Sequence, residues 1–464
     1  MKPIRFCLQW LLILLPLGLA AEPLTEERLI ELVRANHPVL ERARLDLKRA
    51  EAKRLEKQGA FDAKVGGGTR FLRYNSSAGI GQVQKVLESR FSVDFLTRYG
   101  IGVSTGFKRA AGDIKTPVKP TGEDGEYFLE LTVPLLRGLG QNPKAAAESQ
   151  AFLGEDQALL KLRRTELKLL QDALSNYWAW VGAKRKLEVE ERLLRLAKVR
   201  VEAIEHKIAS GLLPKINLVE AQREVQRRLG RVLKAERTLQ KTAFKLGLFL
   251  WQSPLQPAPV PEMDQIPPSV PEPANFTRIQ LESGKLSALE GRPELQALDL
   301  AQELAAIDRE LARNQLLPRL DLVLSQGYQT GDDAIEGPVI KAGVKMSLPV
   351  LRRAAKGRLQ QAMLTLSNLD LQKKQSIQAV MIEVADWFSQ INATYERYLA
   401  ARRELEFARK LEQGEKDAFT LGDSTLFLVN RRERATGEAH LKLIDILVEY
   451  HQAIAGFKAA TAKF

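Results

Sequence analysis

Apolar residues recur every seven positions in two long stretches of the sequence that contain no proline, residues 145–208 and 354–418. A seven-residue apolar seam packs one helix against another with a left-handed supercoil. At 1.5 Å per residue each stretch would run about 95 Å as one helix, far beyond the usual globular length. The pattern therefore predicts two very long coiled-coil helices. The series are Leu187, Leu194, Val201 and Ile208, with Ala197 and Ile204 beside them, and Val384, Ile391, Tyr398 and Leu405.

The period changes from seven to two in the segments between the helices. Near position 340, Ile340, Val344 and Met346 alternate with polar or small residues. Strands of this kind suit a membrane β-barrel, and they suit equally a soluble antiparallel sheet with one wet face. Two or four such strands cannot enclose a conducting lumen, so a barrel would have to be shared between subunits. The other alternating segments are residues 99–107, 129–133 and 320–324.

Short motifs of the first half of the chain recur in the second half in the same order. Matching motifs are 255 residues apart for the first two pairs, then 215 and 211. The first half therefore carries an extra 40 residues, roughly positions 75–125, which predict an additional hairpin or loop at the periphery of the strand region. Such a repeat indicates one fold unit built twice. The pairs are residues 36–40 and 291–295, 60–65 and 315–320, 133–137 and 348–352, and 210–212 and 421–423.

A segment with eight prolines, residues 253–275, joins the two halves and favours an extended linker over a helix. The chain is predicted to be mainly α with a smaller β part. Each half has the order helix, strands, very long helix, sharp turn and helix. The first helices are expected at residues 25–58 and 292–314. The predicted repeats are residues 21–252, with strands within 61–136 and a turn near 211, and residues 276–464, with strands within 318–349 and a turn near 422.

Residues 1–20 have the composition of a secretory signal peptide. Lys2 and Arg5 precede an apolar run, and small residues follow at positions 18 and 20. Cleavage is expected after Ala20, which would remove Cys7, the single cysteine, and leave no disulfide in the mature chain. No other stretch reaches the ~18 apolar residues that a transmembrane helix needs, so a membrane-embedded part would consist of strands.

Composition excludes some classes of protein but leaves the partner open. The chain is 45% hydrophobic and 27% charged, which excludes a disordered chain and a polytopic helical membrane protein. Its formal charge of +13 would suit nucleic acid, acidic lipid or an anionic cargo, and the signal peptide argues against nucleic acid. No catalytic or metal-ligand pattern is evident, so no enzyme activity, metal or cofactor is expected. The four histidines are scattered: His37, His206, His440 and His451.

The chain resembles the TolC-type outer-membrane efflux protein family over essentially its whole mature length. The resemblance rests on the two helix–strand–helix halves and on three kinds of short motif. These are Pro-Leu-Leu-Arg-Gly at residues 134–138 with its counterpart at 349–353, the glycine-centred turns at Gly211 and Gly422, and the strand entry at residues 59–62. Each motif is short, but their order, spacing and duplication make the match fairly specific.

The resemblance implies a homotrimeric channel in the outer membrane with a long periplasmic extension. Strands from three subunits, usually four from each, would form one shared β-barrel, and the long helices would form a periplasmic tunnel. The helical turns would form the tip, which meets a periplasmic adaptor protein and, behind it, an inner-membrane pump. The residues that match the turns gripped by adaptors are Ser210, Gly211, Leu212, Leu421, Gly422 and Asp423.

The expected channel entrance departs from the family pattern. Relatives often carry aspartates six and nine residues after the second turn glycine, where this sequence has Leu428 and Arg431. A basic constriction is therefore expected in place of a cation-selective one. Three copies of Arg431 around one axis would repel, so partners such as Glu220, Glu433 or bound anions are expected. The alternative is that Arg431 points outward and is simply solvated. The candidate entrance residues are Asn217, Leu428, Arg431 and Arg432.

Two alternatives to an efflux channel remain open from the sequence. The first is an exported, basic coiled-coil scaffold of the cell envelope. The second is the same channel fold serving type I protein secretion, with a different pump and cargo. The sequence does not name the cargo, the pump or the adaptor.

Overall fold

The computed structural model describes residues 23–75, 83–112, 121–332 and 337–464. The expected signal peptide, residues 1–20, lies outside this part of the chain. The two longest helices, α3 (Pro143–Ala209) and α7 (Arg353–Leu421), lie where the seven-residue pattern predicts them. The other helices are α1 (Glu26–Asn36), α2 (Pro38–Gln58), α4 (Ile216–Gly247), α5 (Arg278–Gly291), α6 (Pro293–Asn314) and α8 (Leu426–Ala460). The strands are β1 (Lys64–Asn75), β2 (Val83–Leu96), β3 (Gly102–Gly112), β4 (Gly125–Pro134), β5 (Trp251–Ser253), β6 (Gln256–Pro257), β7 (Arg319–Thr330) and β8 (Val339–Ser347).

The chain divides into two units by its internal contacts. The first, here called the helical unit, contains α1, α4 and α8, and the second, the sheet unit, contains the long strands. Both α3 and α7 contribute residues to each unit, and each unit takes residues from both halves of the sequence. The helical unit comprises Met1–Glu41, Glu166–Ala288 and Ile382–Phe464, and the sheet unit comprises Arg42–Thr165 and Leu289–Met381.

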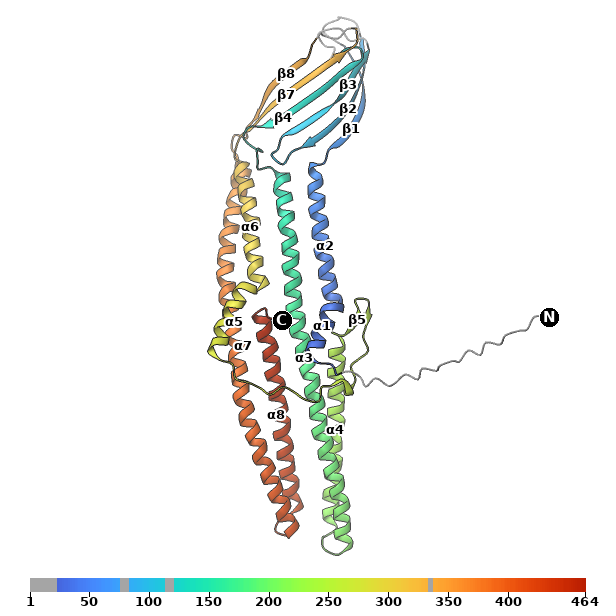
Figure 1. Cartoon of the computed structure of the whole chain (residues 1–464), viewed down its shortest axis with the longest axis vertical. Coiled ribbons are helices and arrows are strands. Elements are labelled where there is room, and N and C mark those ends of the chain that lie inside the picture. The colour runs from blue at the N-terminus through green and yellow to red at the C-terminus, as the bar shows by residue number, and fades with distance from the viewer. Residues whose placement is uncertain (1–22, 76–82, 113–120, 333–336) are drawn as a thin grey trace, which may run out of the picture. The chain divides into compact units, whose positions relative to one another are not determined.

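The sheet unit is built on one six-stranded antiparallel sheet in the order β1-β2-β3-β4-β7-β8 (Figure 1). Strands of the two halves of the sequence join where β4 pairs with β7, from Gly125 opposite Thr330 to Pro134 opposite Asp321. β1 and β8 are the two edge strands. The sheet is therefore completed by both repeats and has one edge strand from each.

The additional hairpin of the first half is not peripheral. It consists of β2 and β3, which lie between β1 and β4. β2 pairs with the whole length of β1, from Lys64 opposite Asp94 to Asn75 opposite Val83. The hairpin fits inside the sheet because its strands alternate apolar and polar residues in step with their neighbours. The prediction of a peripheral hairpin or loop is therefore wrong, and the sheet has six strands where the family resemblance implies four.

A proline divides the first expected helix, residues 25–58, into α1 and α2. Proline lacks an N–H group and pushes the preceding residue out of the helical conformation. His37, before Pro38, has φ −72° and ψ 126° accordingly. The second half has the same break, since Arg292 (φ −71°, ψ 117°) precedes Pro293 between α5 and α6. α5 is not among the predicted helices.

The predicted seven-residue seams are buried. In the helical unit, Leu187 and Ile204 of α3, and Val384 and Ile391 of α7, are each at most 1% exposed. Trp180 of α3 is equally buried in a core that also includes residues of α1 and α4. Each such side chain stabilises the fold by roughly 1.5–3 kcal/mol. Trp178, Trp180 and Trp387 of the long helices therefore serve packing, as their spacing predicts.

A buried histidine packs against this core. The ring of His451 in α8 stacks on Trp178, with centroids 3.9 Å apart and planes 13° apart. Its Nε2 atom lies 3.2 Å from the carbonyl oxygen of Pro271 in the proline-rich linker. Burial lowers the pKa of His451 to about 4, outweighing the hydrogen bond to Pro271, because the imidazolium would lose its hydration. The folded helical unit therefore holds this histidine neutral.

The stability of the helical unit should depend on the protonation of His451. Because its pKa is lower in the folded chain than its ordinary value of 6.5, its contribution is complete above pH 6.5 and is lost as the pH falls toward 4. His451→Gln should reduce the loss of stability over this range by up to about 3 kcal/mol. The measurement is unfolding of the helical circular dichroism signal at pH 7 and pH 4.5. An equal pH dependence in both proteins would contradict the assignment.

Candidate functional site

One face of the six-stranded sheet is apolar and exposed. A row of aromatic side chains crosses four strands, because Phe91, Phe107, Tyr127 and Tyr328 lie opposite one another in successive pairs. The rings of Phe107 and Tyr127 have centroids 5.1 Å apart. Phe91, Tyr127 and Tyr328 are 54%, 60% and 60% exposed, so this apolar face has no cover from the chain itself. By register the same face also carries Val65, Phe71, Leu87, Val103, Leu129, Leu131, Leu324, Ile340, Val344 and Met346.

The opposite face of the sheet is polar and carries charge pairs between neighbouring strands. Arg70 of β1 lies opposite Glu88 of β2, with Nη2 and Oε2 2.5 Å apart. Lys108 of β3 lies opposite Glu126 of β4, with Nζ and Oε1 2.9 Å apart. Cross-strand pairs of opposite charge stabilise the sheet and hold the side chains in place. The sheet thus separates an apolar side from a charged side.

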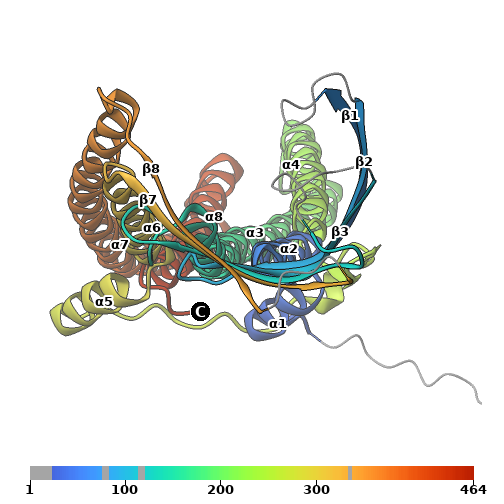
Figure 2. The same cartoon turned by 90° about the horizontal axis from the view of Figure 1, so that it is seen from above.

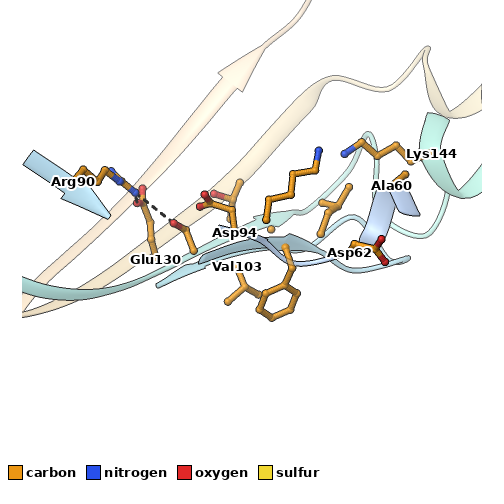
Figure 3. A pocket seen from close by; sticks show the side chains of 13 residues that line it. Ala60, Asp62, Arg90, Asp94, Val103, Glu130 and Lys144 are labelled. Atoms are coloured by element: carbon orange, nitrogen blue, oxygen red, sulfur yellow. Dashed lines mark hydrogen bonds and ion pairs between the residues drawn. The ribbon is translucent and has the colours of Figure 1, made fainter. Parts of the chain in front are cut away.

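A hollow of about 410 Å³ opens on the charged side (Figure 3). Its lining includes Arg90, Asp94 and Glu130 of the strands and Lys144 at the start of α3. Arg90 Nη2 and Glu130 Oε2 lie 3.5 Å apart across the hollow. Val103 points to the other side of the sheet from Asp94 and Lys144. The side chains around the hollow are those expected of a surface in contact with water and dissolved ions.

The long helices α3 and α7 end in the same kind of turn. Gly211 and Gly422 follow the two helix ends with φ of 73° and 91°, a conformation that favours glycine. In each turn the amide after the glycine donates to a carbonyl five residues back, the pattern of a Schellman motif. These bonds are Leu212 N–H to Lys207 O and Asp423 N–H to Ala418 O, both 2.9 Å. The two glycines therefore end helices and reverse the chain, whatever else the turns contact.

The candidate entrance residues lie in the first turns of α4 and α8. Arg431 is exposed, while Asn217 and Leu428 are half-buried. Arg432 is turned toward the end of α7, where its Nε atom lies 3.3 Å from Glu415 Oε2. Ser210 donates a hydrogen bond to the carbonyl of His206 within α3. The structure brings these residues to the same ends of the helices as the glycine turns.

Close to the two turns, a buried carboxylate joins four helices. Glu433 of α8 is fully buried and pairs with Arg200 of α3, Arg228 of α4 and Lys416 of α7. Arg228 Nη2 and Glu433 Oε2 lie 2.9 Å apart, and Lys416 Nζ and Glu433 Oε1 lie 3.4 Å apart. Arg228 also pairs with Glu224, with Nε and Oε1 2.9 Å apart. These residues are here called the Glu433 cluster.

Burial raises the pKa of Glu433, but the hydrogen bond from Arg200 and the charges of Arg200, Arg228 and Lys416 together hold that pKa below its ordinary value. Glu433 is therefore charged and fully partnered within its own chain. It is not available to neutralise Arg431, so this expected pairing is not found. The sequence does hold a signal for the cluster, because Arg228 and Glu433 are charged residues on helical faces that also carry apolar residues such as Val232 and Val429.

Comparison with known proteins supports the family resemblance. Residues 286–462 match the model of a family described as outer membrane efflux protein. This match lies in the second half of the chain and extends from α5 through α8. No curated protein matches it in sequence.

Several solved structures have the fold of this chain over nearly its whole length. The CmeC outer membrane channel of Campylobacter jejuni has a TM-score of 0.66 at 13% identity, covering 94% of this chain and 85% of that one. The outer membrane protein VceC of Vibrio cholerae has a TM-score of 0.65 at 16% identity, covering 94% and 95%. The MtrE outer membrane channel of Neisseria gonorrhoeae has a TM-score of 0.65 at 13% identity, covering 94% and 88%.

The solved structures confirm the fold class that the sequence predicts, mainly helical with a smaller sheet. The family description also agrees with the predicted location in the outer membrane. No helix within residues 23–75, 83–112, 121–332 and 337–464 is long and apolar enough to cross a membrane. Among the same described residues, no group of histidine, cysteine and carboxylate side chains could hold a metal ion.

The Glu433 cluster should be essential to the helical unit. Glu433→Gln would leave Arg200, Arg228 and Lys416 without their shared counter-charge, and removing one partner of a buried ion pair costs about 3–5 kcal/mol. The control is Glu438→Gln, since Glu438 is 64% exposed and pairs with Arg231 at 3.6 Å. That change should cost no more than about 1 kcal/mol. Denaturant unfolding of the purified chains compares the two, and equal effects would contradict a structural role for the cluster.

Proposed function

We propose that the chain is one subunit of an outer-membrane channel that passively conducts substrates from the periplasm to the exterior. The observation that carries the proposal is the sheet with one apolar face, one charged face and two unpaired edges. The apolar face suits lipid and the charged face suits water. A strand edge left open in lipid would expose unpaired backbone groups, each at a cost of several kcal/mol.

The topology of the sheet allows copies of the chain to close it. Successive strands are antiparallel throughout, so β1 and β8 run in opposite directions. The β1 edge of one copy can therefore continue the antiparallel sheet at the β8 edge of the next. Three copies of six strands would give eighteen strands, and barrels of about 16–18 strands leave an aqueous channel. In such a homotrimer the charged face would line the lumen.

The turns at the ends of α3 and α7 are proposed to meet a periplasmic adaptor protein, behind which an inner-membrane pump supplies the substrate. Leu212 and Leu421, beside the two turn glycines, are 71% and 78% exposed, so both side chains are accessible to a partner. Asn217, Leu428, Arg431 and Arg432 are proposed to border the periplasmic entrance. The same arrangement would serve type I protein secretion with a different pump.

The large exposed apolar face argues against the alternative of a coiled-coil scaffold in the periplasm. A soluble protein rarely exposes an apolar patch of more than a few hundred Å², and here apolar side chains of all six strands share one uncovered face. A scaffold would need only the helices. The sheet is explained by contact with lipid.

Assembly and conduction can be measured on the full chain purified in mild detergent. Light scattering should give the mass of three copies, because the two edges of one sheet remain unpaired until the ring closes. The same preparation should produce conductance steps in planar lipid bilayers. A monodisperse monomer with full helical content, or a trimer without conductance, would contradict the proposal.

The place of the extra hairpin in the membrane wall can be tested by introducing lysine on its two faces. Phe91→Lys puts a charge on the apolar face of β2, which should cost about 2–4 kcal/mol of stability in lipid near the membrane midplane. The control Arg90→Lys introduces lysine at the neighbouring position of β2, whose side chain lies on the charged face, and should have little effect. Urea unfolding of the chain from phospholipid vesicles measures both. If the two variants lose equal stability, β2 does not contact lipid.

A further inference from the structure

The charges on the polar face of the sheet are unevenly distributed among the strands. By register, seven basic and five acidic side chains of the described strands lie on this face. All five acidic side chains belong to the inner strands. The basic ones are Lys64, Arg70, Arg90, Lys108, Arg319, Lys341 and Lys345, and the acidic ones are Glu88, Asp94, Glu126, Glu130 and Asp321.

The acidic side chains already have partners within the chain. Glu88, Glu126 and Glu130 pair with cations of neighbouring strands. Asp321 of β7 pairs with Arg319 of its own strand, with Nε and Oδ2 2.7 Å apart. Asp94 accepts a hydrogen bond of 2.9 Å from Ser92. Little negative charge therefore remains on this face to neutralise further cations.

The unpaired cations lie on the two edge strands. In the part of the chain that the structure describes, Lys64 of β1 and Lys341 and Lys345 of β8 make no ion pair. Lys341 and Lys345 are exposed and stand opposite Ser325 and the already paired Asp321. Neither edge strand contains an acidic residue on either face: their sequences are KVGGGTRFLRYN and VIKAGVKMS.

We propose that the channel is selective for anions and that Lys341 and Lys345 of β8, beside Lys64 and Arg70 of the neighbouring copy's β1, form the selective surface. The inference rests on the proposed trimeric barrel, in which β8 of one copy pairs with β1 of the next. Whatever the register of that junction, β1 offers no carboxylate to the lysines of β8. Adjacent strands are about 4.8 Å apart, so each junction becomes a basic stripe facing the lumen.

Three such stripes would set the potential inside the barrel. Charges on a low-dielectric wall focus their field into the enclosed water, and the Debye length is about 8 Å at physiological ionic strength. Small anions are drawn in and cations are depleted. The substrate class that fits is solutes bearing carboxylate, sulfonate or phosphate groups. These basic stripes account for part of the excess positive charge of the sequence.

Reversal potentials in planar bilayers test the proposal with the full-length protein in a tenfold KCl gradient. The wild-type channel should pass chloride in preference to potassium. Lys341→Glu with Lys345→Glu should lower the chloride-to-potassium permeability ratio several-fold. Lys341→Arg with Lys345→Arg, which keeps both charges, should leave it unchanged. Lys341→Gln with Lys345→Gln provides a neutral variant should the glutamates prevent insertion, and it should lower the ratio to a smaller extent.

Arg431→Asp distinguishes ion selectivity set by the barrel from selectivity set by the helical entrance, because it changes the charge only at the end of α8 next to the Gly422 turn. A wild-type channel that conducts but prefers potassium would overturn the inference and leave the proposed channel intact. A ratio that responds to Arg431→Asp but not to the paired lysine variants would also overturn it. A protein that shows no conductance at all would instead refute the proposed channel function.

Discussion

The proposed assembly depends on one constraint, which is that an antiparallel sheet whose apolar face contacts lipid cannot leave its edges unpaired. Each of the six strands has one side suited to lipid and one suited to water. The outward-facing backbone groups of the edge strands β1 and β8 have no strand partner in the part of the chain that the structure describes. A barrel shared between copies satisfies both requirements together. In the proposed trimer, the contacts between subunits and the charged lining of the lumen follow from this closure.

In the helical unit the helices must select their partners, because long helices with similar apolar seams can pair in several ways. Buried leucines and isoleucines hold the helices together but discriminate weakly between partners and registers. The Glu433 cluster adds discrimination, since its ion pairs form only when α3, α4, α7 and α8 are in one arrangement. Because replacing a buried ion pair by well-packed apolar residues is often neutral or stabilising, we infer that the cluster serves specificity more than stability.

Much of the fold could be predicted from the sequence, because coiled coils require apolar residues at seven-residue spacing and sheets with one apolar face require them at every second position. Leu187 and Val384 are buried where the heptads place them. The position of the β2–β3 hairpin could not be predicted, because alternation identifies strands but does not order them. The Glu433 cluster was missed for a related reason. A charged residue in an apolar helical face is recognisable, but its partners come from three other helices and depend on the tertiary fold.

In the proposed trimer, three copies close one barrel and each contributes six strands. Single-particle electron microscopy of the purified assembly can count these strands, at a resolution that separates them. We expect eighteen strands around one axis, with β8 of each copy beside β1 of the next. A barrel of twelve strands with β2 and β3 outside the wall, or a sheet whose edges remain unpaired, would contradict it.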